Sequence, residues 1–215
     1  MKAPSVKPVP MALVDAVRPF VSRQVWAMIQ LQLLTGMRSG EVTSLRGCDI
    51  AKKERVWEYS PPMHKTAYRG RERTICLGPQ AQEVLRPFFK DDEAAFVFSP
   101  RDAESERNAK RRQTRATPMT PNHVQRSQTR RRPEKSPGER YTPQSYGRAI
   151  QYAVSKAKSA HWSPHQLRHT AATFIREQFG LEAAQVILGH SRADVTQIYA
   201  ETNRKKAAEI MANVA

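Results

Sequence analysis

A histidine and an arginine lie three residues apart in the segment SPHQLRHTAAT, where His165 precedes Arg168. On a helix this spacing places both side chains on one face, in the first turns after the start signal formed by Ser163 and Pro164. Free backbone N–H groups and the positive end of the helix dipole gather there, so a bound phosphate would be favoured. A histidine and an arginine at this spacing also commonly occur on helix surfaces that have no function. His169 lies about 100° around the helix from Arg168 and is assigned to packing.

A second candidate is Arg38 in the segment TGMRSGEVTSL. It follows a helix end predicted at Gly36 and precedes a helix start near Ser39, so the corner should hold it rigidly. Its planar guanidinium can bind two phosphate oxygens at once. Glu41 is within reach to orient this arginine or to cap the next helix. An ordinary salt bridge between Arg38 and Glu41 explains the segment equally well.

The C-terminal part of the chain contains the pair Gly189 and His190, followed nine residues later by Tyr199. A tyrosine in a helical region is ordinarily a core residue whose hydroxyl is satisfied by a neighbour. Taken alone, Tyr199 fits that interpretation.

The elements that would position these side chains are mainly helices. Apolar residues at helical spacing, with capping and stop residues at their ends, predict them. In chain order they are expected at residues 22–35, 39–45, 78–90 with a break at Pro87, 142–158, 163–178, 181–188, 193–199 and 204–212. Gly36 and Gly180 are predicted helix stops. The proline-punctuated residues 1–10 are expected to be an extended lead-in.

Two strand-like stretches, residues 56–59 and 73–77, flank Gly70 and predict a small antiparallel β-hairpin or sheet. The expected fold class is therefore α+β and mainly helical, with one folded domain over residues 11–215. No run of about 18 apolar residues and no secretion signal occurs, so a cytoplasmic, nucleoid-associated protein is expected. Cys48 and Cys76 are interpreted as reduced packing residues.

The chain is strongly basic, with 36 Lys and Arg against 20 Asp and Glu and a formal charge of +16. This excess indicates a polyanionic partner, which could be nucleic acid or an anionic membrane. Residues 101–140 hold twelve basic and five acidic residues and few apolar ones. They are expected to form a mobile loop that orders on DNA, or else a solvated insertion without a role. The consecutive Asp91, Asp92 and Glu93 cannot all face one metal ion and are expected in a solvated turn.

Taken in chain order, these motifs resemble the catalytic signature of the tyrosine recombinases, also called phage-type integrases. The matching residues are Arg38 in TGMRSGE, His165 and Arg168 in HQLRHT, His190 in LGH, and the terminal Tyr199. The resemblance runs from residue 11 to residue 213, apart from 101–140. It implies the DNA breaking-rejoining fold and a catalytic domain over residues 11–215.

The same family uses a lysine on a β-hairpin, and the segment HKTAYRGRERTICL places Lys65 at the matching position. Lys52 and Lys53, on an earlier turn, are the alternatives. With Lys65 included, no position of the family signature is missing. The complete set favours an active enzyme over a degenerate relative that only binds DNA.

The resemblance also implies a mechanism without metal, ATP or another cofactor. Tyr199 would attack a backbone phosphorus, with His165 as the base, to give a 3′-phosphotyrosyl bond and a free 5′-hydroxyl. Lys65 would protonate the departing oxygen. The groups that would stabilise the non-bridging oxygens are Arg38, Arg168 and His190.

The implied partner is double-stranded DNA, bound by a homotetramer whose protomers could be monomers in isolation. Residues 204–215 would either dock on a neighbouring protomer or pack on their own domain. Family members usually carry a separate N-terminal DNA-clamping domain, which is expected to be absent from this chain. The alternatives are a type IB topoisomerase, which the HQLRHT and LGH segments disfavour, and a basic DNA-binding protein that never cuts.

Overall fold

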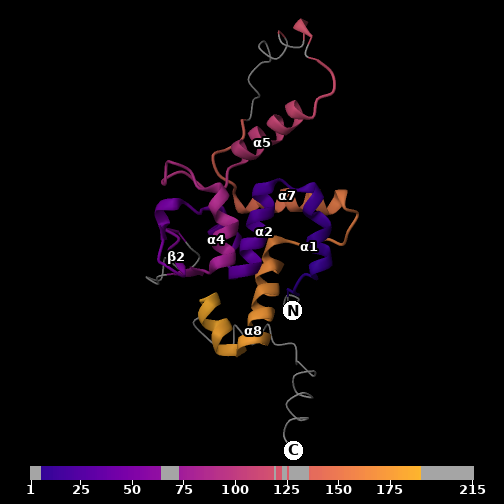
Figure 1. Cartoon of the computed structure of the whole chain (residues 1–215). Coiled ribbons are helices and arrows are strands. Elements are labelled where there is room, and N and C mark those ends of the chain that lie inside the picture. The colour runs from indigo at the N-terminus through magenta and orange to yellow at the C-terminus, as the bar shows by residue number, and fades with distance from the viewer. Residues whose placement is uncertain (1–5, 64–72, 119, 123–124, 126–135, 190–215) are drawn as a thin grey trace, which may run out of the picture.

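The computed structural model describes residues 6–63, 73–118, 120–122, 125 and 136–189. Helices dominate, as expected, and a small antiparallel sheet lies at one side of the helical body, near α4 (Figure 1). No helix within the described ranges is long and apolar enough to cross a membrane. The elements in chain order are α1 (Met11–Val17), η1 (Arg18–Phe20), α2 (Arg23–Thr35), α3 (Ser39–Thr43), η2 (Gly47–Asp49), β1 (Ile50–Ala51), β2 (Trp57–Tyr59), β3 (Ile75–Leu77), α4 (Pro79–Leu85), η4 (Arg86–Phe88), α5 (Pro100–Gln113), α7 (Pro143–Lys156) and α8 (Pro164–Leu188), where η denotes a 3₁₀ helix.

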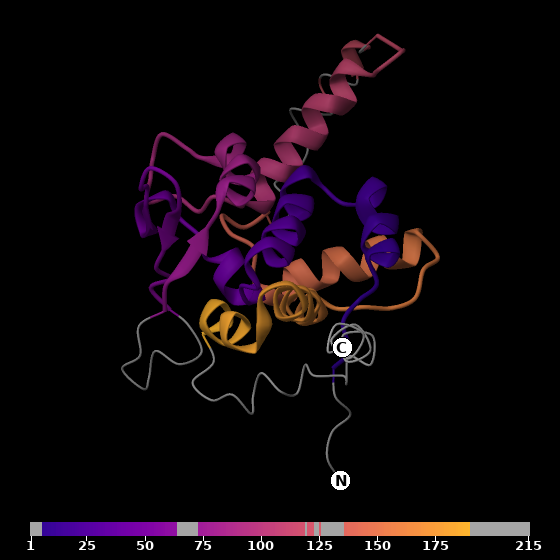
Figure 2. The same cartoon turned by 60° about the horizontal axis from the view of Figure 1, so that its bottom comes forward.

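Helix α2 is the centre of the fold and packs against α8, α4, α3 and α7 (Figures 1 and 2). It begins where the Ser22 hydroxyl accepts a hydrogen bond from the Val25 N–H at 3.2 Å. It ends at Gly36, whose left-handed conformation (φ 65°) favours glycine. Both ends agree with the prediction. Because neighbours cover several of its sides, buried residues occur all around the helix.

The sheet has the strand order β1-β2-β3, and both pairs are antiparallel. Trp57 pairs with Leu77, which confirms the pairing expected between the two strand-like stretches. The sequence did not predict β1, which has only two residues. The connection that contains Gly70 lies outside the described residues.

Helix α8 consists of two helical pieces joined at Gly180, where the backbone is non-helical (φ 91°, ψ 176°). The first piece begins with the expected capping arrangement, because the Ser163 N–H donates to Gln166 Oε1 at 3.0 Å. The second piece folds back, and four buried residues from the two pieces form a cluster separate from the main core: Ala172, Ile175, Ala184 and Leu188. The predicted stop at Gly180 is thereby confirmed.

The structure forms helix α5 where a loop was expected for residues 101–140, and that expectation is wrong for residues 101–113. The Ser99 hydroxyl accepts from the Arg101 N–H at 3.2 Å, and Pro100 occupies the first turn. None of the residues of α5 is buried, and the helix projects from the body (Figure 1). Alanine, glutamate, arginine and lysine have high helix propensity, so this segment forms a helix without an apolar face.

Other local predictions have mixed outcomes. The break near Pro87 is confirmed, because α4 ends at Leu85 and a 3₁₀ helix follows. The acidic residues 91–93 are exposed, as expected. The packing role given to Cys48 and Cys76 is wrong, because both are exposed. Within the lead-in, residue Val9 is buried, and its N–H donates to Thr170 Oγ1 at 2.9 Å on α8.

Candidate active site

The corner between α2 and α3 holds Arg38 through a set of short polar contacts. Gln32 Nε2 donates to the Met37 carbonyl at 3.0 Å. The Arg38 N–H donates to Glu41 Oε2 at 2.6 Å, and Arg38 Nη1 donates to Glu41 Oε1 at 2.9 Å. Glu41 is only 2% exposed, whereas the Arg38 side chain is 25% exposed. The Glu41 carboxylate therefore orients the Arg38 side chain and also accepts from the backbone N–H of Arg38, the N-cap residue of α3. The guanidinium keeps access to solvent.

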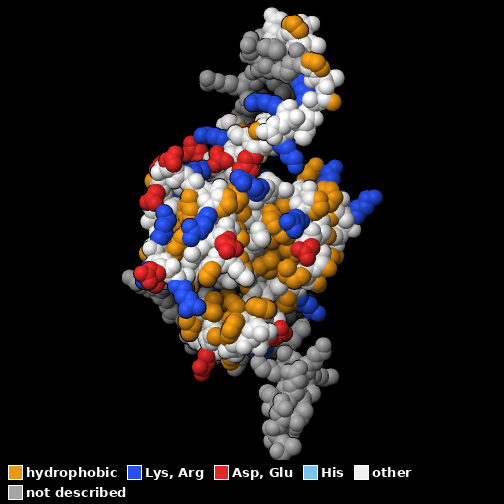
Figure 3. Space-filling view, viewed as in Figure 1, with side chains coloured by type: hydrophobic (Ala, Val, Ile, Leu, Met, Phe, Trp, Pro, Cys, Tyr) orange, Lys and Arg blue, Asp and Glu red, His pale blue; other side chains and the backbone are white. Residues whose placement is uncertain are grey.

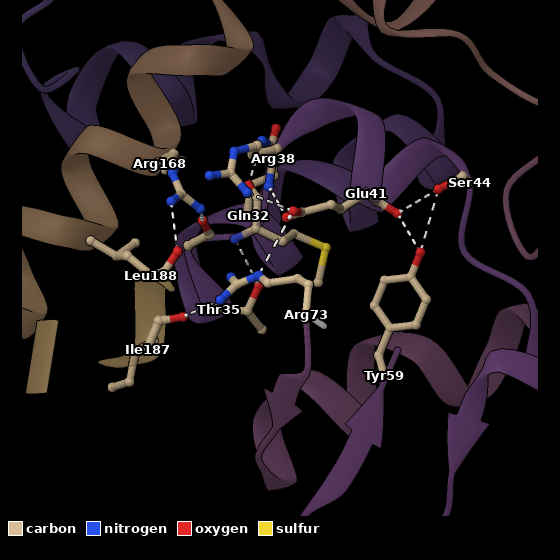
Figure 4. A network of polar contacts seen from close by, with 12 residues as sticks. Gln32, Thr35, Arg38, Glu41, Ser44, Tyr59, Arg73, Arg168, Ile187 and Leu188 are labelled. Carbon is tan, nitrogen blue, oxygen red and sulfur yellow. Dashed lines mark hydrogen bonds and ion pairs between the residues drawn. The ribbon is translucent and has the colours of Figure 1, made fainter. Parts of the chain in front are cut away.

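Arg168 joins this corner to the two ends of α8 (Figure 4). Its side chain is buried, with Nη1 donating to the Gly36 carbonyl at 2.5 Å and Nη2 donating to the Leu188 carbonyl at 2.8 Å. A Cβ on Gly36 would lie 2.6 Å from Leu188 Cδ2, so any other residue here would also force that buried side chain to shift. The segments TGMRSGE, HQLRHT and LGH are thus held together by one guanidinium.

Three of the six predicted site residues lie outside the described part of the chain: Lys65, His190 and Tyr199. Gly189 ends α8 in the left-handed conformation, with φ 65°. In the sequence, His190 comes directly after this glycine, two residues beyond the carbonyl that Arg168 binds. Lys65 falls in the connection between β2 and β3.

His165 and His169 form a pair that the sequence interpretation missed. Their Nε2 atoms lie 3.1 Å apart, so one donates to the other, and the rings meet edge-on at 4.7 Å between centroids. His165 is exposed and His169 is buried, as expected for a packing residue. Burial, followed by the charges of His165 and Arg168, lowers the pKa of His169 to about 4. The buried ring is therefore neutral at pH 7 and can orient the exposed one. The signal was the spacing of four residues, which stacks side chains along a helix.

The low pKa of His169 makes folding sensitive to acid. Its folded pKa of about 4 lies below the ordinary histidine pKa of 6.5, so the unfolded chain binds the proton more readily. Neutral His169 thereby contributes at most about 3 kcal/mol to the free energy of unfolding. This contribution is present above about pH 6.5 and is lost as the pH falls towards 4. Urea unfolding at pH 7.5 and pH 5 should show a smaller drop for His169→Gln than for the wild type. The exposed His161→Gln is the control, and an equal drop in all three proteins would contradict the assignment.

Two further residues contact Glu41 and were not singled out from the sequence. The Tyr59 hydroxyl donates to the Glu41 carbonyl at 2.9 Å, and burial raises the pKa of this phenol. Arg73 Nε lies 3.8 Å from Glu41 Oε1. Tyr59 lies on β2 and Arg73 lies just before β3, both well separated from Glu41 in sequence, so no local spacing could reveal them.

Known tyrosine recombinases are similar to this chain over most of its length. Tyrosine recombinase XerD of Vibrio vulnificus is 26% identical over 204 residues, covering 93% of this chain and 56% of that protein. Tyrosine recombinase XerC of Corynebacterium glutamicum is 37% identical over 192 residues, covering 85% of this chain and 48% of that protein. The chain thus spans about half the length of these relatives.

Solved structures share the fold at low sequence identity. The Tn1549 transposon integrase in complex with circular intermediate DNA superposes with a TM-score of 0.62 at 20% identity, covering 100% of this chain and 68% of that chain. A lambda integrase dimer bound to a COC′ core site gives a TM-score of 0.61 at 14% identity, covering 95% of this chain and 62% of that chain. The profile of the phage integrase family matches residues 12–206. This match covers nearly the whole chain, and the chain therefore belongs to the phage integrase family.

Proposed function

We propose that this chain is the catalytic part of a site-specific DNA recombinase that cuts and rejoins strands through a covalent 3′-phosphotyrosyl intermediate. The observation that carries the proposal is the position of Arg168. Its guanidinium binds the corner that presents Arg38 and the helix end that leads to His190. Motifs far apart in the sequence are therefore joined in one place, as a phosphate-binding site built from several segments requires.

The chemistry divides among the six residues as follows. Tyr199 Oη attacks the phosphorus while His165 accepts the phenolic proton, and a new P–O bond forms. The bond from phosphorus to the 5′-oxygen breaks, and Lys65 supplies the proton to that oxygen. Arg38, Arg168 and His190 stabilise the charge on the non-bridging oxygens, and each such donor lowers the barrier by about 3 to 4 kcal/mol. The reverse attack by a 5′-hydroxyl rejoins a strand, so no external energy source is needed.

The proposal is tested by trapping the covalent protein–DNA intermediate. The substrate is a library of duplexes with a random-sequence core, each with a nick next to a potential cleavage position. Cleavage there releases a short fragment and prevents rejoining, so an SDS-resistant protein–DNA adduct should accumulate. The reaction is run in EDTA, and the captured 3′-ends are sequenced. An adduct in EDTA supports the tyrosine mechanism, and its absence with DNA binding intact would favour a basic protein that does not cut.

The type IB topoisomerase alternative has no support among the relatives described above, which are named recombinases and integrases. A topoisomerase of that type would relax supercoiled plasmid as a monomer. We expect instead that a captured target site supports strand exchange between two duplexes, in a complex with four protomers. Residues 204–215, which lie outside the described residues, are proposed to dock between neighbouring protomers in that complex. Sedimentation of the protein with and without target DNA tests this assembly.

The outer part of α5 is proposed to contact the DNA backbone. The acidic residues of α5 have basic partners within 3.2 Å: Lys90 for Asp102, Arg107 for Glu104 and Arg23 for Glu106. By contrast, Lys110, Arg111 and Arg112 are exposed, and no carboxylate in the described part of the chain forms an ion pair with them. Figure 3 shows basic side chains along this projecting arm, which points away from the second piece of α8. Any DNA bound here is a flanking segment rather than the cleaved phosphate.

Replacing Lys110, Arg111 and Arg112 together by glutamine is expected to weaken duplex binding and its salt dependence. Each lost phosphate contact reduces the slope of log K against log salt by about 1, so the slope should fall by about 2 to 3. The matched control replaces Lys52, Lys53 and Lys90, which pair with Glu93, Glu58 and Asp102. Both variants lose the same formal charge. Equal slopes for the two would show that total charge, and not α5, determines binding.

A further inference from the structure

Arg73 lies just before strand β3 and reaches across to two other segments (Figure 4). Its side chain is 7% exposed. On one side, Nε lies 3.8 Å from Glu41 Oε1 on α3. On the other side, Nη1 donates to the Ile187 carbonyl at 3.2 Å in the last turn of α8. One side chain thus connects the sheet, the Arg38 corner and the helix end that precedes His190.

The contact with α8 also involves Gly189. A Cβ built on Gly189 would lie 3.1 Å from Arg73 Cζ and closer still to Nη1. The guanidinium therefore packs directly on the backbone at this residue, and φ of 65° adds a second reason for glycine. The last turn of α8 has two arginine partners, because Arg168 binds the Leu188 carbonyl while Arg73 binds the neighbouring carbonyl of Ile187. Carbonyls at a helix end have no partner within the helix, so these bonds fix the position of that end.

The contact with Glu41 places one carboxylate between two guanidinium groups. Glu41 Oε1 accepts from Arg38 Nη1 at 2.9 Å, and its 3.8 Å separation from Arg73 is an ion pair too long for a hydrogen bond. Arg73 therefore helps to set the orientation of the Glu41 carboxylate, which in turn orients Arg38. Burial, and after it the charge of Arg38, lower the pKa of Arg73, while Glu41 raises it.

Arg73 is not placed for maximal stability. Its Nε and Nη2 atoms are buried and make no hydrogen bond to any residue that the structure describes. Unsatisfied buried donors cost about 1 to 3 kcal/mol each, and an aliphatic side chain of similar length would avoid that cost. Buried donors that lack partners need an explanation other than stability. For Arg73 the explanation is that its side chain fixes the positions of the segments around it.

We propose that Arg73 is a positioning residue that clamps the last turn of α8 against the Glu41–Arg38 pair and so sets where the chain continues into His190. The clamp itself follows from the contacts of the described residues, whereas its effect on strand cleavage rests on the function proposed above. The experiment therefore has one readout that does not need cleavage and one that does.

The first readout is amide hydrogen exchange in Arg73→Met, with Arg46→Met as the matched control. Arg46 also pairs with a nearby carboxylate, Asp49, at 2.9 Å. In Arg73→Met, amides of residues 184–189 should exchange about tenfold faster or more, while those of residues 167–175 keep wild-type rates. Arg46→Met should leave both segments unchanged. Uniform protection in Arg73→Met, or the same acceleration in the control, would overturn the clamp.

The second readout is the single-turnover rate of adduct formation at saturating nicked DNA. Displacement of catalytic groups by about 1 Å costs roughly a hundredfold, so Arg73→Met should lose about 30- to 100-fold in rate with DNA affinity within about threefold. A purely structural role would lower the amplitude of the reaction and leave the rate constant of the folded fraction intact. Arg73→Lys retains the charge and one partner and should recover part of the rate.

The outcomes separate the two proposals. Faster exchange at 184–189 together with a slower rate supports the positioning role, and faster exchange with an unchanged rate would overturn its link to cleavage. If the wild type forms no adduct, the proposed function fails and the exchange data alone decide the clamp. If Arg73→Met does not fold, Arg73→Lys takes its place in both measurements.

Discussion

Replacing Tyr199 by phenylalanine is expected to abolish the SDS-resistant adduct, to below about one thousandth of the wild-type rate. Phenylalanine has no oxygen to form the bond to phosphorus, whereas its ring fills nearly the same volume. Duplex affinity should stay within about twofold. The measurement is single-turnover capture on the nicked substrate, paired with a binding titration in EDTA.

The matched control for this change is Tyr152→Phe, which removes a hydroxyl from an exposed tyrosine on α7. It should form the adduct at the wild-type rate. Buried tyrosines are poor substitutes for the nucleophile, because burial raises the pKa of Tyr59, Tyr141 and Tyr146. An adduct that persists in Tyr199→Phe would disprove the assignment, and peptide mapping of that adduct would identify the residue attached to DNA.

Arg168→Met is expected to reduce both stability and cleavage. The change removes the donors to the Gly36 and Leu188 carbonyls, so the free energy of unfolding should fall by about 2 to 4 kcal/mol. Among molecules that remain folded, the adduct rate should fall by about a hundred- to a thousandfold, because the cation that we propose stabilises the non-bridging oxygens is lost. Urea unfolding measures the first effect, and capture at a temperature where the variant is fully folded measures the second.

Arg168→Lys separates these two effects, because lysine keeps the charge and cannot bridge the two carbonyls in the same plane. It should regain part of the rate and little of the stability. The control is Arg148→Met, an exposed arginine on α7 that should change neither quantity. Unchanged stability in Arg168→Met would show that the carbonyls find other partners and that the guanidinium does not hold the corner.

Local signals were sufficient for much of the fold. Gly36 and Gly180 both adopt the positive φ values that make glycine a helix stop, so the ends they mark could be predicted from sequence. The capping pattern at Ser163 is also a local signal, and it correctly located the start of α8. Helix α5 was missed because the absence of apolar residues was taken to mean a loop. Helix propensity, one ion pair within the helix (Arg107 with Glu104) and two ion pairs to Lys90 and Arg23 form that helix without a buried face.

The candidate site was predicted less completely. Arg38, His165 and Arg168 could be named because each lies in a segment that resembles the family signature. Arg73 could not, because its partners Glu41 and Ile187 are separated from it by long stretches of chain, and only the folded structure brings them together. The same holds for the backbone role of Arg168, since side-chain spacing along a helix says nothing of a carbonyl on another segment.

Two arginines bind neighbouring carbonyls at the end of α8. The short piece of α8 after Gly180 is therefore expected not to tolerate changes in length. Each residue added to a helix rotates everything beyond it by about 100° and advances it by about 1.5 Å. A single insertion between Gly180 and Ile187 would therefore turn the carbonyls of Ile187 and Leu188 away from Arg73 and Arg168. Sequence changes in this piece are expected to be substitutions, whereas the surface helix α5, which buries no residue, can gain or lose whole turns.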